Sequence, residues 1–511
     1  MNGIDNSCDI AGSHSLATRQ AQSEITTGIS AGRSITVSGE EKKEKTSLLD
    51  LSAFPLIFRY LKLRDIRSLE QVCTYLHAAV KENNALAKAW YRQFFSTHQY
   101  QLRTAITTKN DHQFRSWFES FSNDMALVDS LTNRKREAVF CPALLYFNKT
   151  NLMSECKTFK LETKDTIHAN AIIRTAALSV DGRYLVTAVG DNSAMVYAQG
   201  ANGSWVIKTA IIHNDLVTSA NFSLDGRHVV TASRGREAKI YSLGRDESWE
   251  TNVTVTLDSA IRSASFSPDS QHVVIVSMER MAQIHSLKNN GSWELTANLY
   301  DVRSATFSAD SRRLVTAERG STEMKIHSQK SDGSWEVKNI IRLEDSINLI
   351  SFSPEDRYVI TLNGHSKARM YRCETNESWK SVVEIQHKQV IHSTTFSADG
   401  RHVATASLDG IVKIYGQRAG GLWEEKTIID HKHSVESVTF SSDSRHLVTT
   451  CHSHTAKIIG QEADGSWVEK ACITHACWIL SATFSADSSR VITAGCDGTV
   501  QITELQRSDV Y

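Results

Sequence analysis

The chain has 511 residues, enough for two or three domains, and its 57 basic and 57 acidic residues give a formal net charge of zero. A balanced charge argues against a protein that binds nucleic acid or anionic membranes through a strong overall field. No apolar run reaches the length of about 18 residues that a membrane helix needs, so we expect neither a nucleic-acid nor a membrane partner.

Residues 1–45 are rich in Ser, Thr, Gly and charged side chains, and they contain no apolar stretch typical of a signal peptide. A segment of this composition buries too little apolar surface to fold, so we predict a disordered polar arm.

The nine cysteines form no Cys-x-x-Cys pair, so the sequence predicts neither a disulfide framework nor a zinc module, and a reducing compartment fits best. Cys472, His475 and Cys477 stand close together, but they fall on a predicted strand and its following loop. Strand packing explains them, so we predict no metal site and no cofactor.

Residues 46–95 predict two short amphipathic helices, because apolar residues recur there every three or four positions. The recurring residues are Phe54, Ile57, Phe58 and Leu61, then Ile66, Leu69, Val72, Cys73 and Leu76. Asp65 can cap the second helix, since its carboxylate can accept from the free amides of the first turn. On composition alone the segment is a small helical bundle of no special purpose.

The order of residues in this segment resembles an F-box. The matching groups are Ile57-Phe58-Arg59-Tyr60-Leu61, Asp65-Ile66, Val72-Cys73 and Trp90-Tyr91. The resemblance implies a small all-α domain that binds a Skp-type adaptor of a cullin complex. Its adaptor-binding residues would be Leu49, Phe54, Ile57, Phe58 and Leu61.

Two departures from the F-box pattern bear on adaptor binding. Asp50 stands where the family has a proline after Leu49, and Leu76 replaces the usual tryptophan. Because the Leu-Pro pair belongs to the face that holds the adaptor, we expect a reduced affinity.

Residues 96–155 include "FRSWFESF" and "NRKREAVFCPALLYF", which predict one or two helices and a linker. In the resembled architecture this stretch is a spacer between the adaptor and the next domain.

Residues 156–507 contain a segment that recurs eight times at intervals near 44 residues. Its anchors are Leu178, Phe222, Phe266, Phe307, Phe352, Phe396, Phe440 and Phe484. Each unit has four short β-branched and aromatic runs, and a period of this length is typical of four-stranded propeller blades. Asp-Gly at 181–182, 225–226 and 399–400 suits a tight turn, whereas Asp-Ser, which replaces it in four units, is a weaker turn former.

Seven tryptophans mark the start of the outer strand of a unit, one fewer than the eight anchors. They are Trp205, Trp249, Trp293, Trp335, Trp379, Trp423 and Trp467. The missing outer strand is expected near 157–163, with Leu161 at the tryptophan position, and it would close the ring beside the last unit. The sequence therefore predicts an eight-bladed β-propeller over residues 156–507, and an α+β multidomain chain as a whole.

The units resemble WD repeats. His213, His387, His431 and His475 match the family histidine, and Asp191 and Asp409 match the turn aspartate before an aromatic residue. The family's buried hydrogen-bond relay accounts for these histidines, so we interpret them as structural.

An F-box followed by a WD-repeat propeller resembles the substrate receptors of Skp-cullin-F-box ubiquitin ligases. The resemblance implies a chain that is not an enzyme, acts in the cytoplasm or nucleus, and brings a client protein to the ligase. The alternative is a WD-repeat scaffold for protein complexes without ligase function, including a bacterial effector that is secreted into a eukaryotic host cell.

Receptors of this family bind phosphorylated clients through arginines four positions before the anchor and just before the turn aspartate. Arg174, Arg262 and Arg303 occupy the first position in units one, three and four, and Arg234 occupies the second in unit two. Arginine forms forked hydrogen bonds with phosphate, so these four residues are the predicted client-binding set. The alternative is a solvated surface, which the neighbouring Asp258, Asp301, Glu318 and Glu344 would neutralise.

Overall fold

The computed structural model describes residues 85–122, 124–136, 142–200, 203–318, 320–363, 366–374, 378–418, 421–462 and 464–508. The predicted polar arm, and the predicted adaptor-binding residues Leu49, Phe54, Ile57, Phe58 and Leu61, lie outside the described residues. The described helices and strands belong to one compact unit. Among the described helices, none has the length and apolar character needed to span a bilayer.

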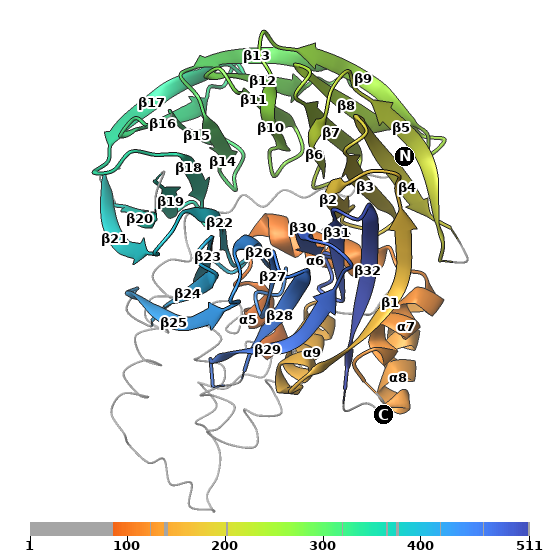
Figure 1. The fold of residues 1–511 in the computed structure, drawn as a ribbon. Coiled ribbons are helices and arrows are strands. Elements are labelled where there is room, and N and C mark those ends of the chain that lie inside the picture. The colour runs from red at the N-terminus through yellow and green to blue at the C-terminus, as the bar shows by residue number, and fades with distance from the viewer. Residues whose placement is uncertain are drawn as a thin grey trace, which may run out of the picture. The chain divides into compact units, whose positions relative to one another are not determined.

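Eight antiparallel four-stranded sheets form a ring, and they are the eight blades of a β-propeller (Figure 1). In blades 1 to 7 the strands run in chain order from strand a, beside the central channel, to strand d at the rim, whereas the outer strand of blade 8 is β1, the first strand of the chain. The sequence prediction of an eight-bladed propeller is therefore confirmed.

The strands of blades 1 to 4 are β2 (Ile173–Leu178), β3 (Tyr184–Val189), β4 (Ser193–Gln199) and β5 (Trp205–Ile212); β6 (Val217–Phe222), β7 (His228–Ser233), β8 (Glu237–Leu243) and β9 (Trp249–Thr256); β10 (Ile261–Phe266), β11 (His272–Ser277), β12 (Met281–Leu287) and β13 (Trp293–Tyr300); and β14 (Ser304–Phe307), β15 (Arg313–Ala317), β16 (Glu323–Gln329) and β17 (Trp335–Arg342).

Those of blades 5 to 8 are β18 (Leu349–Phe352), β19 (Tyr358–Leu362), β20 (Lys367–Cys373) and β21 (Trp379–Gln386); β22 (Ile391–Phe396), β23 (His402–Ser407), β24 (Ile411–Gln417) and β25 (Trp423–Asp430); β26 (Val435–Phe440), β27 (His446–Cys451), β28 (Thr455–Gln461) and β29 (Trp467–Thr474); and β30 (Ile479–Phe484), β31 (Arg490–Gly495), β32 (Thr499–Arg507) and β1 (Phe159–His168).

The ring closes where β1 pairs with β32 as the fourth strand of blade 8. Leu161 pairs with Leu505 there, as Trp205 pairs with Gln199 in blade 1, so Leu161 has the register position expected for it. The aromatic contact comes instead from Phe159, two residues earlier, whose ring centroid lies 5.4 Å from that of His446 in blade 7. Closure joins residues from both ends of the propeller sequence, and it leaves only the short outer edge of β1 at this blade.

Each repeated tryptophan is the first residue of a strand d and packs against the preceding blade. Trp293, for example, lies 5.3 Å from His228 at the start of strand b of blade 2, centroid to centroid. Equivalent pairs are Trp249 with Tyr184, Trp335 with His272, Trp423 with Tyr358 and Trp467 with His402. The tryptophan spacing in the sequence therefore reports contacts between blades as well as strand starts.

The turns between strands a and b repeat one hydrogen-bond pattern. In blade 1, Ser179 Oγ donates to Asp181 Oδ1 at 2.5 Å, and the same carboxylate oxygen accepts from the backbone of Arg183. The residue after the aspartate has a positive φ, which is +71° at Gly182 and +62° at Ser444. Serine fits there because its hydroxyl accepts from the turn of the preceding blade: Ser444 Oγ lies 3.0 Å from Asp399 N. Serine is the weaker turn former at this position, but it gains a hydrogen bond to the neighbouring blade.

Four buried histidines form part of the hydrogen-bond relay predicted from the WD repeats. His213, His387, His431 and His475 each place Nε2 within 3.1 Å of a strand-b threonine. The relay continues to an aspartate in two blades, at 3.3 Å from His387 to Asp409 and 3.7 Å from His475 to Asp497. Burial lowers the pKa of His213 and of His431 to about 4, so both are neutral structural groups at neutral pH.

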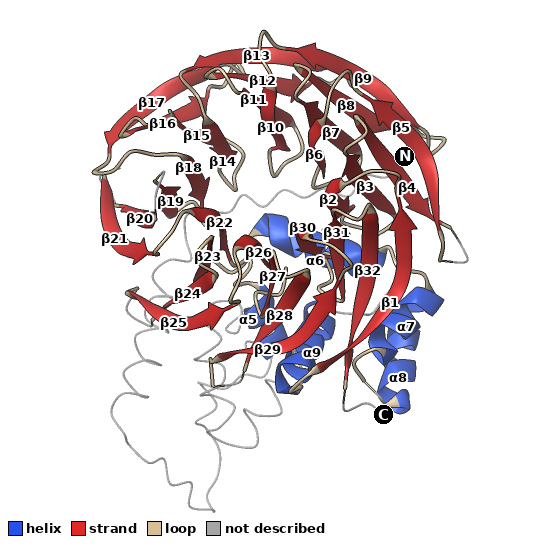
Figure 2. Ribbon diagram, viewed as in Figure 1, coloured by secondary structure: helices blue, strands red, loops and turns tan. Residues whose placement is uncertain are grey.

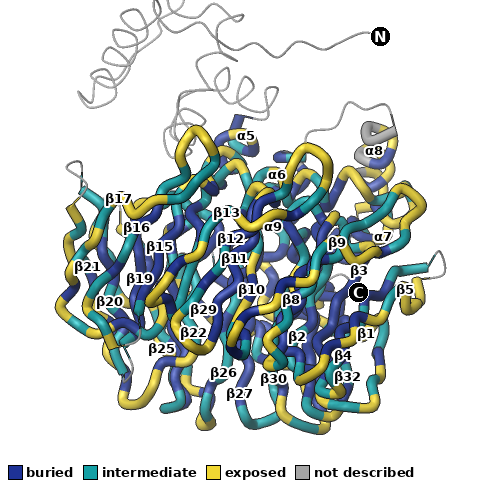
Figure 3. Tube along the Cα trace, turned by 90° about the horizontal axis from the view of Figure 1, so that it is seen from above, coloured by how far each residue is buried: buried dark blue, intermediate teal, exposed yellow. Residues whose placement is uncertain are grey.

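The helices lie along one face of the ring (Figures 2 and 3). Those described are α5 (Ala85–Tyr91), α6 (Ser96–Thr107), α7 (Asp111–Glu119), α8 (Met125–Arg136) and α9 (Pro142–Glu155). Residues 96–155 thus form four helices rather than the one or two expected, and they pack directly on the propeller. Phe114, Trp117, Phe118 and Tyr146 are buried in a core shared with strands of blades 7 and 8.

Buried charges join the helices to the turns between strands a and b. Lys109 Nζ lies 2.8 Å from Asp487 Oδ2, and the buried Lys149 donates to the backbone oxygen of the same Asp487. Burial alone would raise the pKa of Asp487, but Lys109 and Lys149 hold it well below its usual range. We call this end of the ring, with its a–b turns, the helix face.

Candidate client-binding face

The opposite end of the ring is formed by the connections from strand d to strand a and from strand b to strand c. We call it the loop face. The helical segment contacts the other end at Asp487, and α6 lines a hollow there together with the turn residues Ser223, Ser267 and Ala486. The loop face is therefore the end of the propeller at which to look for a binding site.

The second residue of strand a sits in a β-bulge in six blades. These residues are Arg174, Thr218, Arg262, His392, Glu436 and Leu480. In the other two blades, Arg303 and Asn348 directly precede a shorter strand a. A bulge turns a side chain away from the regular alternation of the strand and is common next to binding sites. The eight residues that stand four positions before their anchors thus lie at one level of the channel mouth.

The four predicted client-binding arginines lie on four successive blades. Arg174, Arg262 and Arg303 are partly buried at the starts of the strands a of blades 1, 3 and 4, and Arg234 is exposed in the b–c turn of blade 2. Arg262 Nη2 also lies 3.3 Å from Met278 Sδ. The structure brings the four residues to one half of the loop face, and their binding of a client stays a prediction.

Two of the acidic neighbours have other partners. Glu318 forms an ion pair with Arg280 at 3.0 Å, and Glu344 pairs with Arg369. These carboxylates neutralise arginines outside the predicted set. Asp258 and Asp301 instead line a hollow of about 350 Å³.

A second group of side chains gathers on blades 6 to 8. Glu436 Oε2 lies 3.4 Å from His392 Nδ1 and 3.3 Å from His452 Nε2. The His452 ring stacks on Trp478 with centroids 5.1 Å apart and an interplanar angle of 14°. Trp478 is 48% exposed although it is a large aromatic residue. This half of the face therefore combines a carboxylate, two imidazoles and an accessible indole.

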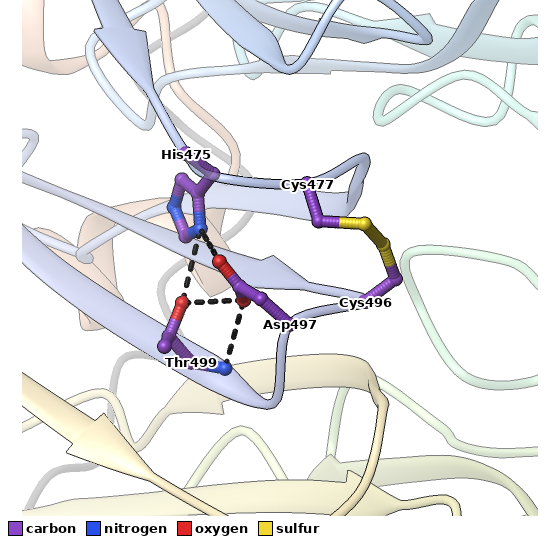
Figure 4. Close-up of a disulfide and its surroundings, with 5 residues drawn as sticks. All are labelled: His475, Cys477, Cys496, Asp497 and Thr499. Carbon is purple, nitrogen blue, oxygen red and sulfur yellow. Dashed lines mark hydrogen bonds and ion pairs between the residues drawn. A yellow bond between two sulfur atoms is a disulfide. The ribbon is translucent and has the colours of Figure 1, made fainter.

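A disulfide joins Cys477 in the d–a connection to Cys496 in the b–c turn of blade 8 (Figure 4). It lies beside His475, Asp497 and Thr499, and Cys496 N donates to Trp478 O at 2.9 Å. The sequence analysis predicted no disulfide framework and missed this bond, because the two cysteines are 19 residues apart in sequence and meet only when the blade folds. In the described residues, no cluster of three or more His, Cys, Asp or Glu side chains could hold a metal ion.

The sequence analysis missed the role of Trp478, although a signal was present. Seven of the ten tryptophans start a strand d, and Trp478 lies outside that register, beside the start of a strand a. A tryptophan that the repeat does not require needs another explanation, and exposure at the channel mouth is consistent with binding.

The comparisons with known proteins agree with this architecture. The family described as WD domain, G-beta repeat matches residues 205–242, 379–416, 423–459 and 468–503. No curated protein sequence matches the chain. The chain therefore carries WD40 repeats, arranged as an eight-bladed propeller.

Solved structures of similar fold include Sqt1 from Saccharomyces cerevisiae, with 15% identity and a TM-score of 0.56 over 68% of this chain and 98% of that one. Sqt1 from Chaetomium thermophilum has 12% identity and a TM-score of 0.56 over 68% of this chain and 99% of that one. A third structure shows Chaetomium thermophilum Sqt1 bound to the N-terminus of the ribosomal protein L10, with 12% identity and a TM-score of 0.56 over 68% and 100% of the two chains. At this identity the likeness concerns the fold.

Proposed function

We propose that the chain is a protein-binding scaffold whose propeller holds a segment of a client protein on the loop face. The observation that carries the proposal is the pattern on that face: equivalent bulged positions hold different charged and apolar side chains in different blades. The bulge is the same in these blades, so the fold alone does not account for this variation.

Exposed apolar side chains on the same face support the proposal. Ile172, Met278, Leu349, Val390 and Trp478 are all exposed near the starts of strands a or in the b–c turns. Such residues mixed with polar groups are typical of a protein interface. The structure of Sqt1 with the L10 N-terminus is a precedent for a propeller of this fold that holds a protein segment.

The finer proposal is that the arginine half of the face binds an acidic or phosphorylated residue of the client. Each forked arginine–phosphate contact contributes roughly 1.5 to 3 kcal/mol, so several contacts would suit micromolar capture of a short motif. Replacing Arg262 and Arg303 by Glu should abolish binding of a phosphorylated client. Unchanged binding would contradict the proposal, and Arg342→Glu, an exposed arginine on strand d of blade 4, is the matched control.

A second candidate function is a substrate receptor of a Skp-cullin ubiquitin ligase. It rests on the F-box pattern at 49–91, of which only the end is described: Trp90 in α5 is buried against Phe94, with ring centroids 4.8 Å apart. In this function the chain would act in the cytoplasm or nucleus, without catalysis of its own, or in the cytoplasm of a host if it is a secreted bacterial effector.

A pull-down with a purified Skp adaptor separates the two candidates. Binding by the wild type that is lost in Leu49→Ala/Phe58→Ala would favour the ligase receptor. Absence of binding by the wild type would leave the scaffold as the function.

A further inference from the structure

The two halves of the loop face differ in chemistry. Blades 1 to 4 present Arg174, Arg234, Arg262 and Arg303, whereas blades 6 to 8 present Glu436, His392, His452 and Trp478. In a ring of eight blades, blades 3 and 4 lie opposite blades 7 and 8. A client segment that crosses the channel mouth would meet a basic surface on one side and a different surface on the other.

Glu436 is held in place without a permanent positive charge. Its Oε2 lies 3.4 Å from His392 Nδ1 and 3.3 Å from His452 Nε2, distances at which an imidazole forms an ion pair with a carboxylate only when it is protonated. An arginine or lysine partner would carry a permanent positive charge against the carboxylate, whereas an imidazole does not. Glu436 is therefore a partly exposed carboxylate, with two imidazoles beside it, that can attract a cation of the client.

Trp478 provides an aromatic surface next to this carboxylate. One side of its indole stacks on His452, and 48% of the residue is exposed. The Cys477–Cys496 disulfide and the bond from Cys496 N to Trp478 O restrict the loop that carries it. Its conformational freedom is therefore already reduced before a ligand binds, which lowers the entropic cost of binding.

We propose that Glu436, His452 and Trp478 form a subsite for a basic side chain, lysine or arginine, of the client. The carboxylate supplies the ion pair, and the indole supplies a cation–π or stacking surface, which is a pairing that suits guanidinium in particular. The proposal rests on the proposed function and deepens it: the client segment carries a basic residue for blades 7 and 8 and an acidic one for blades 1 to 4.

The test uses the full chain labelled with 5-fluorotryptophan, and a Trp478→Phe variant assigns the ¹⁹F resonance of Trp478. The probes are acetyl-Gly-Arg-Gly-amide and the same peptide with citrulline, which has a similar shape but no charge. We expect the arginine peptide to shift the Trp478 resonance with saturation, and the citrulline peptide to bind about tenfold more weakly or not at all.

Glu436→Gln should weaken binding of the arginine peptide at least about fivefold. The other tryptophan resonances should stay in place, which would show that the ring is folded. Glu469→Gln is the matched control, since Glu469 lies on the outer strand β29 and pairs with Lys457 at 2.9 Å, and it should leave the affinity unchanged. Equal shifts with both peptides, no shift with either, or no effect of Glu436→Gln would overturn the subsite.

This experiment needs no client, so its failure is distinct from failure of the proposed function. If Arg262→Glu/Arg303→Glu abolishes client binding but the arginine peptide does not bind, the client-binding face stands and the subsite falls. If the arginine peptide binds as expected but the full chain holds no client on this face, the subsite stands and the proposed function falls.

Discussion

The helix face and the loop face are opposite ends of the same strands, yet they differ in how similar the residues at equivalent positions are from blade to blade. At the helix face, the serine and aspartate of the a–b turn form the same hydrogen bond in blade after blade, as in Ser179–Asp181 and Ser441–Asp443. At the loop face, equivalent positions hold residues as different as Arg262, Glu436 and Leu480. The difference indicates that the regular end stabilises the ring, and it is the basis for the proposal that the varied end binds a client.

The comparison predicts that substitutions at the helix face change stability, whereas most substitutions at the loop face change binding. The disulfide is the exception on the loop face, because it constrains the chain covalently. The following changes are ordered from the largest expected effect to the smallest.

Asp487→Ala should have the largest effect, because it leaves Lys109, and the buried Lys149 near it, without this carboxylate. Removing one partner of a buried ion pair costs about 3–5 kcal/mol of unfolding free energy. Since the folded pKa of Asp487 is depressed, this stabilisation is complete above the unfolded carboxyl pKa of about 4 and is lost as the pH falls below it. Urea unfolding at pH 7 and in acid measures both effects.

The matched control is Glu336→Ala, which removes an exposed partner of Lys330 at 2.6 Å and should change the unfolding free energy little, because solvent screens the pair. Equal losses in the two variants would contradict the account of the helix face.

Cys477→Ser/Cys496→Ser should lower the unfolding free energy by about 3 kcal/mol, since the disulfide closes a loop between residues 19 apart. We expect faster amide hydrogen exchange at 475–480 and 495–499, with unchanged exchange in the a–b turns of the helix face. Dithiothreitol, which reduces the disulfide to two thiols and is itself oxidised, should reproduce the effect in the wild type. A wild type that is insensitive to dithiothreitol would contradict this prediction.

Glu355→Gln should stabilise the protein at high pH only. Burial raises the pKa of Glu355 to about 7, so the folded state prefers the protonated carboxyl. The stability of the wild type is therefore full below the unfolded pKa and declines as the pH rises through about 7. We expect similar stability at pH 4 and a gain of about 1–3 kcal/mol for Glu355→Gln at pH 9, by thermal unfolding. The exposed Glu250→Gln on β9 should show no such pH-dependent gain.

Ser444→Ala should cost about 1 kcal/mol, because the hydroxyl that accepts from Asp399 N is lost while the positive φ of +62° is kept. Ser444→Gly loses the same bond but relieves the strain, so its stability should be close to that of the wild type. Gly182→Ala is the complementary test: no atom lies within 4 Å of an added Cβ, and only its φ of +71° should cost free energy, about 1 kcal/mol. If Ser444→Ala and Ser444→Gly are equally stable, the strain argument is wrong.

The propeller could be predicted because its information is periodic. Phe266 and Trp293 each recur at a nearly fixed interval along the chain, and this recurrence predicted the number of blades. Leu161 lies in the strand that closes the ring. Helices were predicted over 96–155, but their packing on the propeller could not be, because nothing in the sequence distinguishes the buried Lys149 from a solvated lysine. The disulfide and the contact of His452 with Trp478 were also missed, since each joins two loops that meet only after the blades are formed.

The most direct test of the account is a photo-crosslinking comparison between the loop face and the rim of the propeller. A photoreactive amino acid replaces Leu480 at the channel mouth or the exposed Leu295 on the outer strand β13. We predict a discrete crosslinked client at position 480 that disappears in the Arg262→Glu/Arg303→Glu background, and no such product at position 295. The same client at both positions, or a product at position 480 that is insensitive to the arginine substitutions, would contradict the account.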